Sequence, residues 1–152
     1  MTYSSNALEG NSLTETETKI ILEDGLTVGG KPIRDYYEAI GHSAAYDYLY
    51  TLLKQNVVTE AQIKKLHKLF YRLIDEKNAG RYRKQKVFIS GSRYRVPDPE
   101  QISALMSEYI NQLVELRKSR HPVEFAALAH KGFVFIHPFV DGNGRVARLL
   151  RG

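Results

Sequence analysis

The sequence predicts an all-α domain that carries one β-hairpin. Most of its 152 residues fall into segments whose apolar side chains recur every three or four positions, the period of an amphipathic helix. Only one segment breaks that rhythm. Val87–Ile89 and Tyr94–Pro97 have the composition of short strands, and Ser90-Gly91-Ser92 between them is typical of a hairpin turn. The length suits one domain, so we expect residues 1–152 to form a single unit.

Helix start and stop signals divide the rest of the chain. A short helix is expected near residues 4–10, where Ser or Asn can cap it and Gly10 can end it. Further helices are predicted over about 12–23, from Pro32 to about Lys54, from Thr59 or Glu60 onward, from Pro97–Glu100 to the basic run Arg117–Arg120, and over Val123–Ile136. The last of these is apolar almost all round, so we expect it to be buried.

Composition excludes several functional classes. The chain is 43% apolar and 26% charged, as in an ordinary globular protein, and it has no cysteine for disulfide or thiol chemistry. No apolar run approaches the ~18 residues that a membrane span needs, and Met1–Ser5 lacks the features of a signal peptide. We therefore expect a cytoplasmic protein with no membrane partner. The net charge of +5 is dispersed and no nucleic-acid-binding module appears, so we expect no nucleic-acid partner.

The residues that indicate chemistry form one polar run between two apolar segments. That run is His137-Pro138-Phe139-Val140-Asp141-Gly142-Asn143-Gly144-Arg145-Val146-Ala147-Arg148. Gly142-Asn143-Gly144 opens the second apolar segment, and backbone N–H groups at a helix start favour an anion. Arg145 and Arg148 lie on one face of that helix, where two guanidinium groups suit a polyphosphate better than a single carboxylate.

Two further residues of the run complete this interpretation. Asp141 offers one carboxylate, which is how Mg²⁺ is usually held when phosphates supply the other ligands. His137 carries the side chain whose unperturbed pKa, about 6.5, best suits a general base near neutral pH. Taken singly, each residue is explained as well by a turn, a helix end or a solvated face. Their combination in one run favours transfer chemistry on a nucleotide.

The run resembles the signature of the Fic family, His-[Pro]-Phe-x-Asp-Gly-Asn-Gly-Arg-x-x-Arg, at every fixed position. The resemblance implies an all-helical protein adenylyltransferase, which transfers AMP from ATP to a Ser, Thr or Tyr hydroxyl of a target protein. It implies that His137 is the general base, that Asp141 holds Mg²⁺ (or Mn²⁺), and that Arg148 reaches the γ-phosphate. The nucleotide-binding residues that it implies are Asp141, Gly142, Asn143, Gly144, Arg145 and Arg148, with Val87, Phe88, Ile89 and Ser90 of the hairpin.

The resemblance adds two expectations outside the signature. The hairpin would be a flap over the active site, and its bare edge would dock the target segment. Ser5-x-x-x-Glu9-Gly10 resembles the inhibitory motif of the class in which that motif precedes the core (class II). Glu9 would then pair with Arg148 and keep ATP out or misplaced. The structural alternative is a short capped turn.

Two other functions stay open at this point. One is removal of AMP from a modified protein, with Glu9 aligning a water molecule, and the other is a nucleotide-sensing module with negligible turnover. The sequence ends at Arg151-Gly152, about two turns into a helix that family members continue. The family's C-terminal helices are therefore expected to be absent from this sequence. Either the sequence is a fragment of a longer protein, or another element or a second copy of the chain covers the apolar face.

Overall fold

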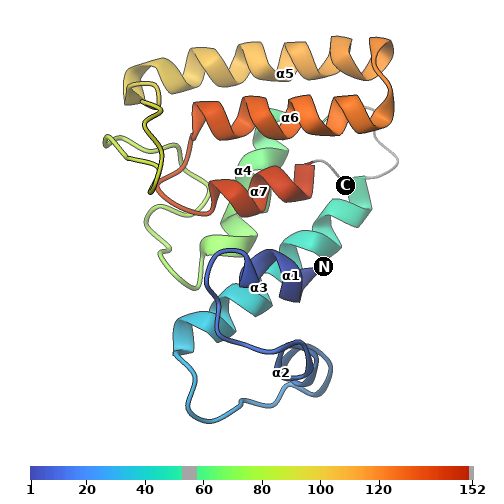
Figure 1. The fold of residues 1–152 in the computed structure, drawn as a ribbon, viewed down its shortest axis with the longest axis vertical. Coiled ribbons are helices and arrows are strands. Elements are labelled where there is room, and N and C mark those ends of the chain that lie inside the picture. The colour runs from blue at the N-terminus through green and yellow to red at the C-terminus, as the bar shows by residue number, and fades with distance from the viewer. Residues whose placement is uncertain (53–57, 151–152) are drawn as a thin grey trace.

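A computed structural model describes residues 1–52 and 58–150, and the regular elements of these ranges are all helices. In chain order they are α1 (Thr2–Ala7), α2 (Glu15–Lys19), a π-helical turn (Ile20–Asp24), α3 (Ile33–Leu52), α4 (Glu60–Tyr71), a 3₁₀ turn (Pro99–Gln101), α5 (Ile102–Ser119), α6 (Pro122–Ile136) and α7 (Asn143–Leu150). Helices α5, α6 and α7 are stacked at one end, α4 and α3 cross beneath them, and α2 closes the other end (Figure 1). None of the described helices combines the length and the apolar composition that crossing a membrane requires.

Short-range capping sets where several helices begin. Thr14 accepts a hydrogen bond from the Glu17 backbone, and the Glu17 carboxylate accepts one from the Thr14 backbone, which forms a capping box at α2. Thr59 and Gln62 make the same exchange at α4. Pro122 opens α6, where a missing N–H costs nothing. These starts agree with the sequence signals, because each depends on residues only three positions apart.

Helix α7 joins two apolar clusters, and this fixes the direction of its polar side chains. Val146 and Ala147 are fully buried in a cluster with Phe133 of α6 and Met106 of α5. Leu149 is buried in the second cluster, among side chains of α3 and α4. Since consecutive residues of a helix point about 100° apart, Arg145 and Arg148, which flank Val146 and Ala147, face the remaining sector.

The predicted hairpin over Val87–Ile89 and Tyr94–Pro97 is wrong. This stretch lies among the described residues and contains no strand. A turn does form, with the Ser92 N–H donating to the carbonyl oxygen of Ile89 at 3.1 Å, but the two arms do not pair. An isolated pair of short strands is marginal in water. Here the second arm instead contacts the helix at Phe135, where the Tyr94 hydroxyl donates to the Phe135 carbonyl at 3.2 Å.

Arg83 holds the ends of this loop together in place of strand pairing. Its buried guanidinium donates to the carbonyl oxygens of Gln85 at 3.0 Å and Pro97 at 2.6 Å. It also donates to the carbonyl of His137 at 2.7 Å. The loop between Gln85 and Pro97 is therefore anchored at its base to the polar run, while Phe88 near its middle is 87% exposed.

Helix α6 is less buried than its composition predicted. Ala129, Phe133 and Ile136 are buried, but Val123 is 72% and Phe135 41% exposed. Among the described residues, α6 packs against α5 and α7, which leaves one side open. The expected end of the helix that starts near Pro32 falls in residues 53–57, outside the described ranges.

The α3–α4 crossing predicts a sensitive glycine. A Cβ added at Gly41 would lie 3.0 Å from the carbonyl carbon of Phe70, a backbone group that cannot move aside. We expect Gly41→Ala to lower the free energy of unfolding by about 1–3 kcal/mol, the usual cost of overpacking. Urea unfolding measures the change. Gly29→Ala is the matched control, because no described residue lies within 4 Å of its added carbon. Equal unfolding midpoints for the two variants would contradict the prediction.

Candidate active site

The first half of the polar run, residues 137–142, forms a tight loop between α6 and α7, and the second half begins α7. His137 ends α6 in the left-handed conformation (φ 52°, ψ 56°), which turns the chain sharply away from the helix. Two residues later Phe139 enters the core, fully buried, with its ring stacked parallel on His67 at 3.8 Å between centroids. The buried ring of Phe139 therefore fixes the first part of the loop in the core.

Asn143 closes the loop on the other side. Its Oδ1 accepts from the Phe139 N–H at 2.9 Å, and its Nδ2 donates to the Phe139 carbonyl at 2.9 Å. Both partners are buried, so these bonds satisfy groups that water cannot reach. The side chain of Asn143 is thus engaged within the loop. Only its backbone N–H, at the start of α7, remains for the phosphate contact that the sequence predicted.

The His137 side chain has the form that a general base needs. Its Nδ1 lies 3.1 Å from the carbonyl oxygen of Val134. A carbonyl only accepts hydrogen bonds, so Nδ1 carries the proton and Nε2 keeps a lone pair. Burial lowers the pKa of His137 and the nearby Arg83 guanidinium lowers it further, against opposing contributions from the Val134 carbonyl and Asp141. The imidazole is therefore neutral at pH 7.

Arg145 brings a buried positive charge to the same loop. Its side chain is almost fully enclosed, with the guanidinium 4.3 Å above the ring of Phe70. Nη1 lies 3.0 Å from Glu38 Oε1, close enough for an ion pair but not aligned for a hydrogen bond. Nε and Nη1 have no hydrogen-bond acceptor within the described part of the chain. Buried donors without an acceptor suit the oxygen atoms of a bound anion.

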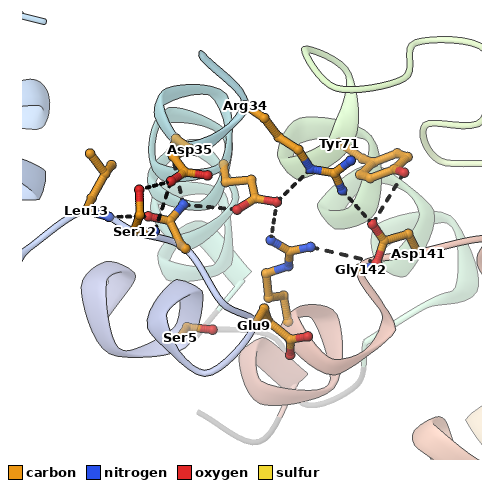
Figure 2. A network of polar contacts seen from close by, with 12 residues as sticks. Ser5, Glu9, Ser12, Leu13, Arg34, Asp35, Tyr71, Asp141 and Gly142 are labelled. Carbon is orange, nitrogen blue, oxygen red and sulfur yellow. Dashed lines mark hydrogen bonds and ion pairs between the residues drawn. The ribbon is translucent and has the colours of Figure 1, made fainter. Parts of the chain in front are cut away.

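Asp141 lies in a network of cations and hydroxyls. Its Oδ2 accepts from Arg34 Nη2 at 2.9 Å and lies 3.5 Å from the Tyr71 hydroxyl (Figure 2). Its Oδ1 accepts from the Gly142 N–H at 2.6 Å. The carboxylate is 43% exposed and borders a cavity of ≈310 Å³. That cavity is lined by Glu9, Gly10, Asn11, Arg34, Asp35, Glu38, Asp141 and Arg145.

Arg148 contacts the segment at the N-terminus. Its Nε donates to Ser5 Oγ at 2.9 Å, and its Nη2 donates to the Ser5 carbonyl at 2.9 Å and to Glu9 Oε1 at 2.7 Å. Gly144 leaves room for this pairing, because a Cβ there would lie 2.6 Å from Glu9 Oε1. The expected helix near residues 4–10 is α1, and Glu9 follows it in a turn. The predicted pairing of Glu9 and Arg148 is present; its inhibitory role stays a prediction.

Similarity to known proteins identifies the family of this chain. Residues 57–151 match the profile of the Fic/DOC family. The chain belongs to this family. It is 38% identical over 150 residues to a protein of Drosophila willistoni named protein adenylyltransferase Fic, and 39% identical over 151 residues to one of that name from Nematostella vectensis. Each alignment covers 97% of this chain but only 30% and 35% of the relative, so the chain spans about a third of their length.

Solved structures show the same fold. Fic-1 of C. elegans superposes with a TM-score of 0.90 at 35% identity, over 99% of this chain and 45% of that one. A Fic-domain-containing signaling protein of Bacteroides thetaiotaomicron gives 0.89 at 33% identity, over 99% of this chain and 59% of the other. The all-helical Fic fold is thus confirmed for the described residues, without the hairpin.

The Fic signature loop fits a metal ion only together with a nucleotide. Within residues 1–52 and 58–150 no three His, Cys, Asp or Glu side chains gather as a metal site. Asp141 is a single, partly exposed carboxylate, and the unsatisfied donors of Arg145 lie on the same loop. This donor set suits Mg²⁺, which commonly takes one or two carboxylates and fills its other positions with phosphate oxygens and water.

The nucleotide contacts of Val87, Phe88, Ile89 and Ser90 stay predictions. None of the four is among the described residues that line the cavity beside Asp141. Val87 and Phe88 border a different hollow of ≈500 Å³, between the two arms of the loop. The loop that carries these residues is linked to the Fic loop by Arg83, which donates to backbone carbonyls of both.

Sequence reasoning missed the residues that support the Fic loop from outside. His67 has no partner pattern in the sequence, but in the structure its Nε2 donates to the Asp141 carbonyl at 3.1 Å while its Nδ1 accepts from the Gly80 N–H at 2.9 Å. Arg34 and Glu38 were not singled out at all. The only available signal was their spacing, an ion pair at i and i+4 inside a helix that is otherwise rich in apolar and aromatic residues.

Asn143 predicts a large structural effect from a small substitution. Asn143→Ala removes two buried hydrogen bonds and leaves the N–H and C=O of Phe139 unsatisfied. We expect the free energy of unfolding to fall by about 2–4 kcal/mol. Chemical unfolding followed by circular dichroism measures it. Asn111→Ala, on the exposed face of α5, is the matched control and should change stability little. A loss at Asn143 no larger than at Asn111 would mean that the loop holds its shape without these bonds.

Proposed function

We propose that the protein is an autoinhibited adenylyltransferase that transfers AMP from ATP to a Ser, Thr or Tyr hydroxyl of a target protein. The proposal rests chiefly on the state of His137. Its neutral imidazole keeps a lone pair on Nε2, in the loop that also carries the Asp141 carboxylate and leads into α7 with the buried, incompletely satisfied Arg145. The relatives named protein adenylyltransferase Fic support the same reaction.

Each residue of the loop has one task in this reaction. The N-terminus of α7 and the Arg145 guanidinium bind the α- and β-phosphates of ATP. Asp141 holds Mg²⁺, which when bound supplies positive charge against the phosphate oxygens. His137 Nε2 takes the proton of the target hydroxyl as its oxygen attacks the α-phosphorus. The new P–O bond forms as the bond from the α-phosphorus to the bridging oxygen breaks, and pyrophosphate leaves.

The target segment approaches, in this proposal, along the loop from Gln85 to Pro97. Arg83 ties both ends of that loop to the carbonyl of His137, so a peptide bound there lies near the base. The exposed ring of Phe88 offers it an apolar contact. Because the described loop contains no strand, docking by strand addition is replaced here by contacts to side chains.

Autoinhibition is the second part of the proposal. Two of the guanidinium nitrogens with which Arg148 would bind a γ-phosphate, Nε and Nη2, donate to Ser5 and Glu9 instead. The arginine side chain is only 12% exposed, and a buried guanidinium that loses its partner is costly, which favours the paired state. The Glu9 carboxylate also repels a phosphate at the same position. Displacement of the segment around Glu9 would then be the step that admits ATP.

Removal of AMP from a modified protein is the second candidate. Glu9 lines the cavity together with Asp141 and Arg145, and its side chain is 34% exposed. A carboxylate in that place can orient a water molecule toward the phosphorus of an AMP-modified residue. The two functions make opposite use of Glu9, so one variant separates them.

Glu9→Gly is expected to activate AMP transfer. If the inhibited state outweighs the competent one by 99:1, the competent fraction is about 0.01 and its release raises the rate roughly a hundredfold. The measurement is incorporation of labelled AMP by the parent, by Glu9→Gly, and by Glu9→Gly with His137→Ala, which should return it to background. Glu76→Gly, at an exposed turn, is the matched control.

Three outcomes separate the candidate functions. A Glu9→Gly variant that is folded and binds ATP but transfers no more AMP than the parent contradicts autoinhibition. Loss of AMP removal from a pre-modified protein in that variant, with no gain in transfer, favours the second candidate. Transfer that survives His137→Ala within tenfold contradicts the base, whose removal should cost about 10²–10⁴-fold.

The lowered pKa of His137 predicts the acid limb of the pH profile. The base works in its neutral form, so kcat/KM of Glu9→Gly should fall as the pH drops through that pKa, with a midpoint below 6.5. Burial lowers the pKa of His42 and His67 to about 4, so folding stability also declines as the pH falls below about 6.5, and circular dichroism must report the folded fraction at each pH. A midpoint above 6.5 in folded protein would contradict the assignment.

A further inference from the structure

We propose that Arg34 is a positioning residue that latches the metal-binding carboxylate: its guanidinium holds Asp141 until a divalent cation displaces it. The inference rests on the proposed function, since it takes Asp141 as the ligand of that cation. It adds a second point of control on the same site, 107 residues away in sequence from the signature loop.

Arg34 connects two carboxylates with one planar group. Its Nη2 donates to Asp141 Oδ2 at 2.9 Å, and its Nε donates to Glu38 Oε1 at 3.1 Å. Figure 2 shows the guanidinium lying between helix α3, which carries it, and the loop that carries Asp141. A rigid fork of donors suits this double contact, and an ammonium group does not reproduce it.

The latch and a metal ion compete for the same oxygen. Asp141 borders the cavity, and its Oδ1 already accepts the Gly142 N–H at 2.6 Å, so we take Oδ2 as the oxygen that a metal ion would bind. Arg34 Nη2 lies 2.9 Å from that Oδ2, and Mg²⁺ would bind it at about 2.0–2.1 Å. Two cations on one oxygen repel each other strongly at such distances. The guanidinium must therefore move before the ion can bind.

Arg34 is itself held by the segment that follows α1. Glu38, nearly buried, accepts from Asn11 Nδ2 at 3.0 Å through Oε2, and it lies 3.0 Å from Arg145 through Oε1. The Ser12 N–H donates to Asp35 at 2.9 Å, next to Arg34 on α3. The chain just after Glu9 thus holds the Glu38 carboxylate in place, and Glu38 in turn holds Arg34. Release of this segment would loosen the contacts on Asp141 and on Arg148 together.

Binding of Mn²⁺ in the presence of ADP tests the latch without any catalytic turnover. ADP lacks the γ-phosphate that Glu9 would oppose, and free Mn²⁺ is counted by its electron paramagnetic resonance signal. Arg34→Ala should bind Mn²⁺ about tenfold more tightly than the parent, because a competing cation has been removed. Asp141→Ala added to Arg34→Ala should abolish the gain. A purely structural role of Arg34 would weaken binding instead.

Two further variants separate a latch from a general effect of charge. Arg34→Lys keeps the positive charge but cannot bridge both carboxylates. It should therefore bind Mn²⁺ more tightly than the parent, by at least half of the gain of Arg34→Ala on a logarithmic scale. Arg120→Ala removes a comparable arginine, half-exposed and 3.0 Å from Glu124, at the α5–α6 connection. It should leave Mn²⁺ affinity unchanged. If Arg34→Lys binds like the parent while Arg34→Ala gains, charge alone acts and the latch is overturned.

The remaining outcomes distinguish this inference from the function on which it rests. Asp141-dependent Mn²⁺ binding of equal strength in the parent and the Arg34 variants overturns the latch and leaves the proposed function standing. Mn²⁺ binding that Asp141→Ala does not change contradicts Asp141 as the metal ligand. That result overturns the latch as well.

Discussion

The pair of hydrogen bonds between the Asn143 side chain and the backbone of Phe139 is the constraint on which the site depends. It closes the polar loop at a point where no water is available, and the stacked rings of Phe139 and His67 fix the same point in the core. His137 lies just before the closure, Asp141 within it, and α7 begins at its end. This small buried contact therefore fixes the relative positions of the His137 imidazole, the Asp141 carboxylate and the N-terminus of α7.

Three arginines lie around this loop, two of them buried and Arg148 largely so, and each is satisfied to a different degree. Arg83 donates to backbone carbonyls, Arg148 to Ser5 and Glu9, and Arg145 keeps donors for which the described residues supply no acceptor. A buried charge with incomplete partners costs folding free energy. Such an arrangement is typical of a binding site, where a ligand completes the set of partners.

The sequence predicted what depends on near neighbours. Capping boxes and the three-to-four-residue period located the helices, and the run from His137 to Arg148 located the candidate site. The burial of α6 could not be predicted from its composition, because burial depends on how many other helices pack against it. The contact of Arg34 with Asp141 was invisible, since an i, i+4 ion pair on a helix is ordinary until the fold brings a loop beside it. The hairpin failed because a local turn signal says nothing about support for its strands.

The anchorage by Arg83 has a consequence for how such a protein diversifies. Its bonds at the base of the loop go to the backbone carbonyls of Gln85 and Pro97, a group that every amino acid possesses. Between these two residues, Lys86 pairs with Asp98 at 3.1 Å and Tyr94 donates to the Phe135 carbonyl at 3.2 Å, whereas Phe88 is largely exposed. Substitutions at such exposed positions can therefore accumulate while Arg83 keeps its bond to the His137 carbonyl. If the loop docks the target, as proposed, partner choice can change there without a change in the chemistry.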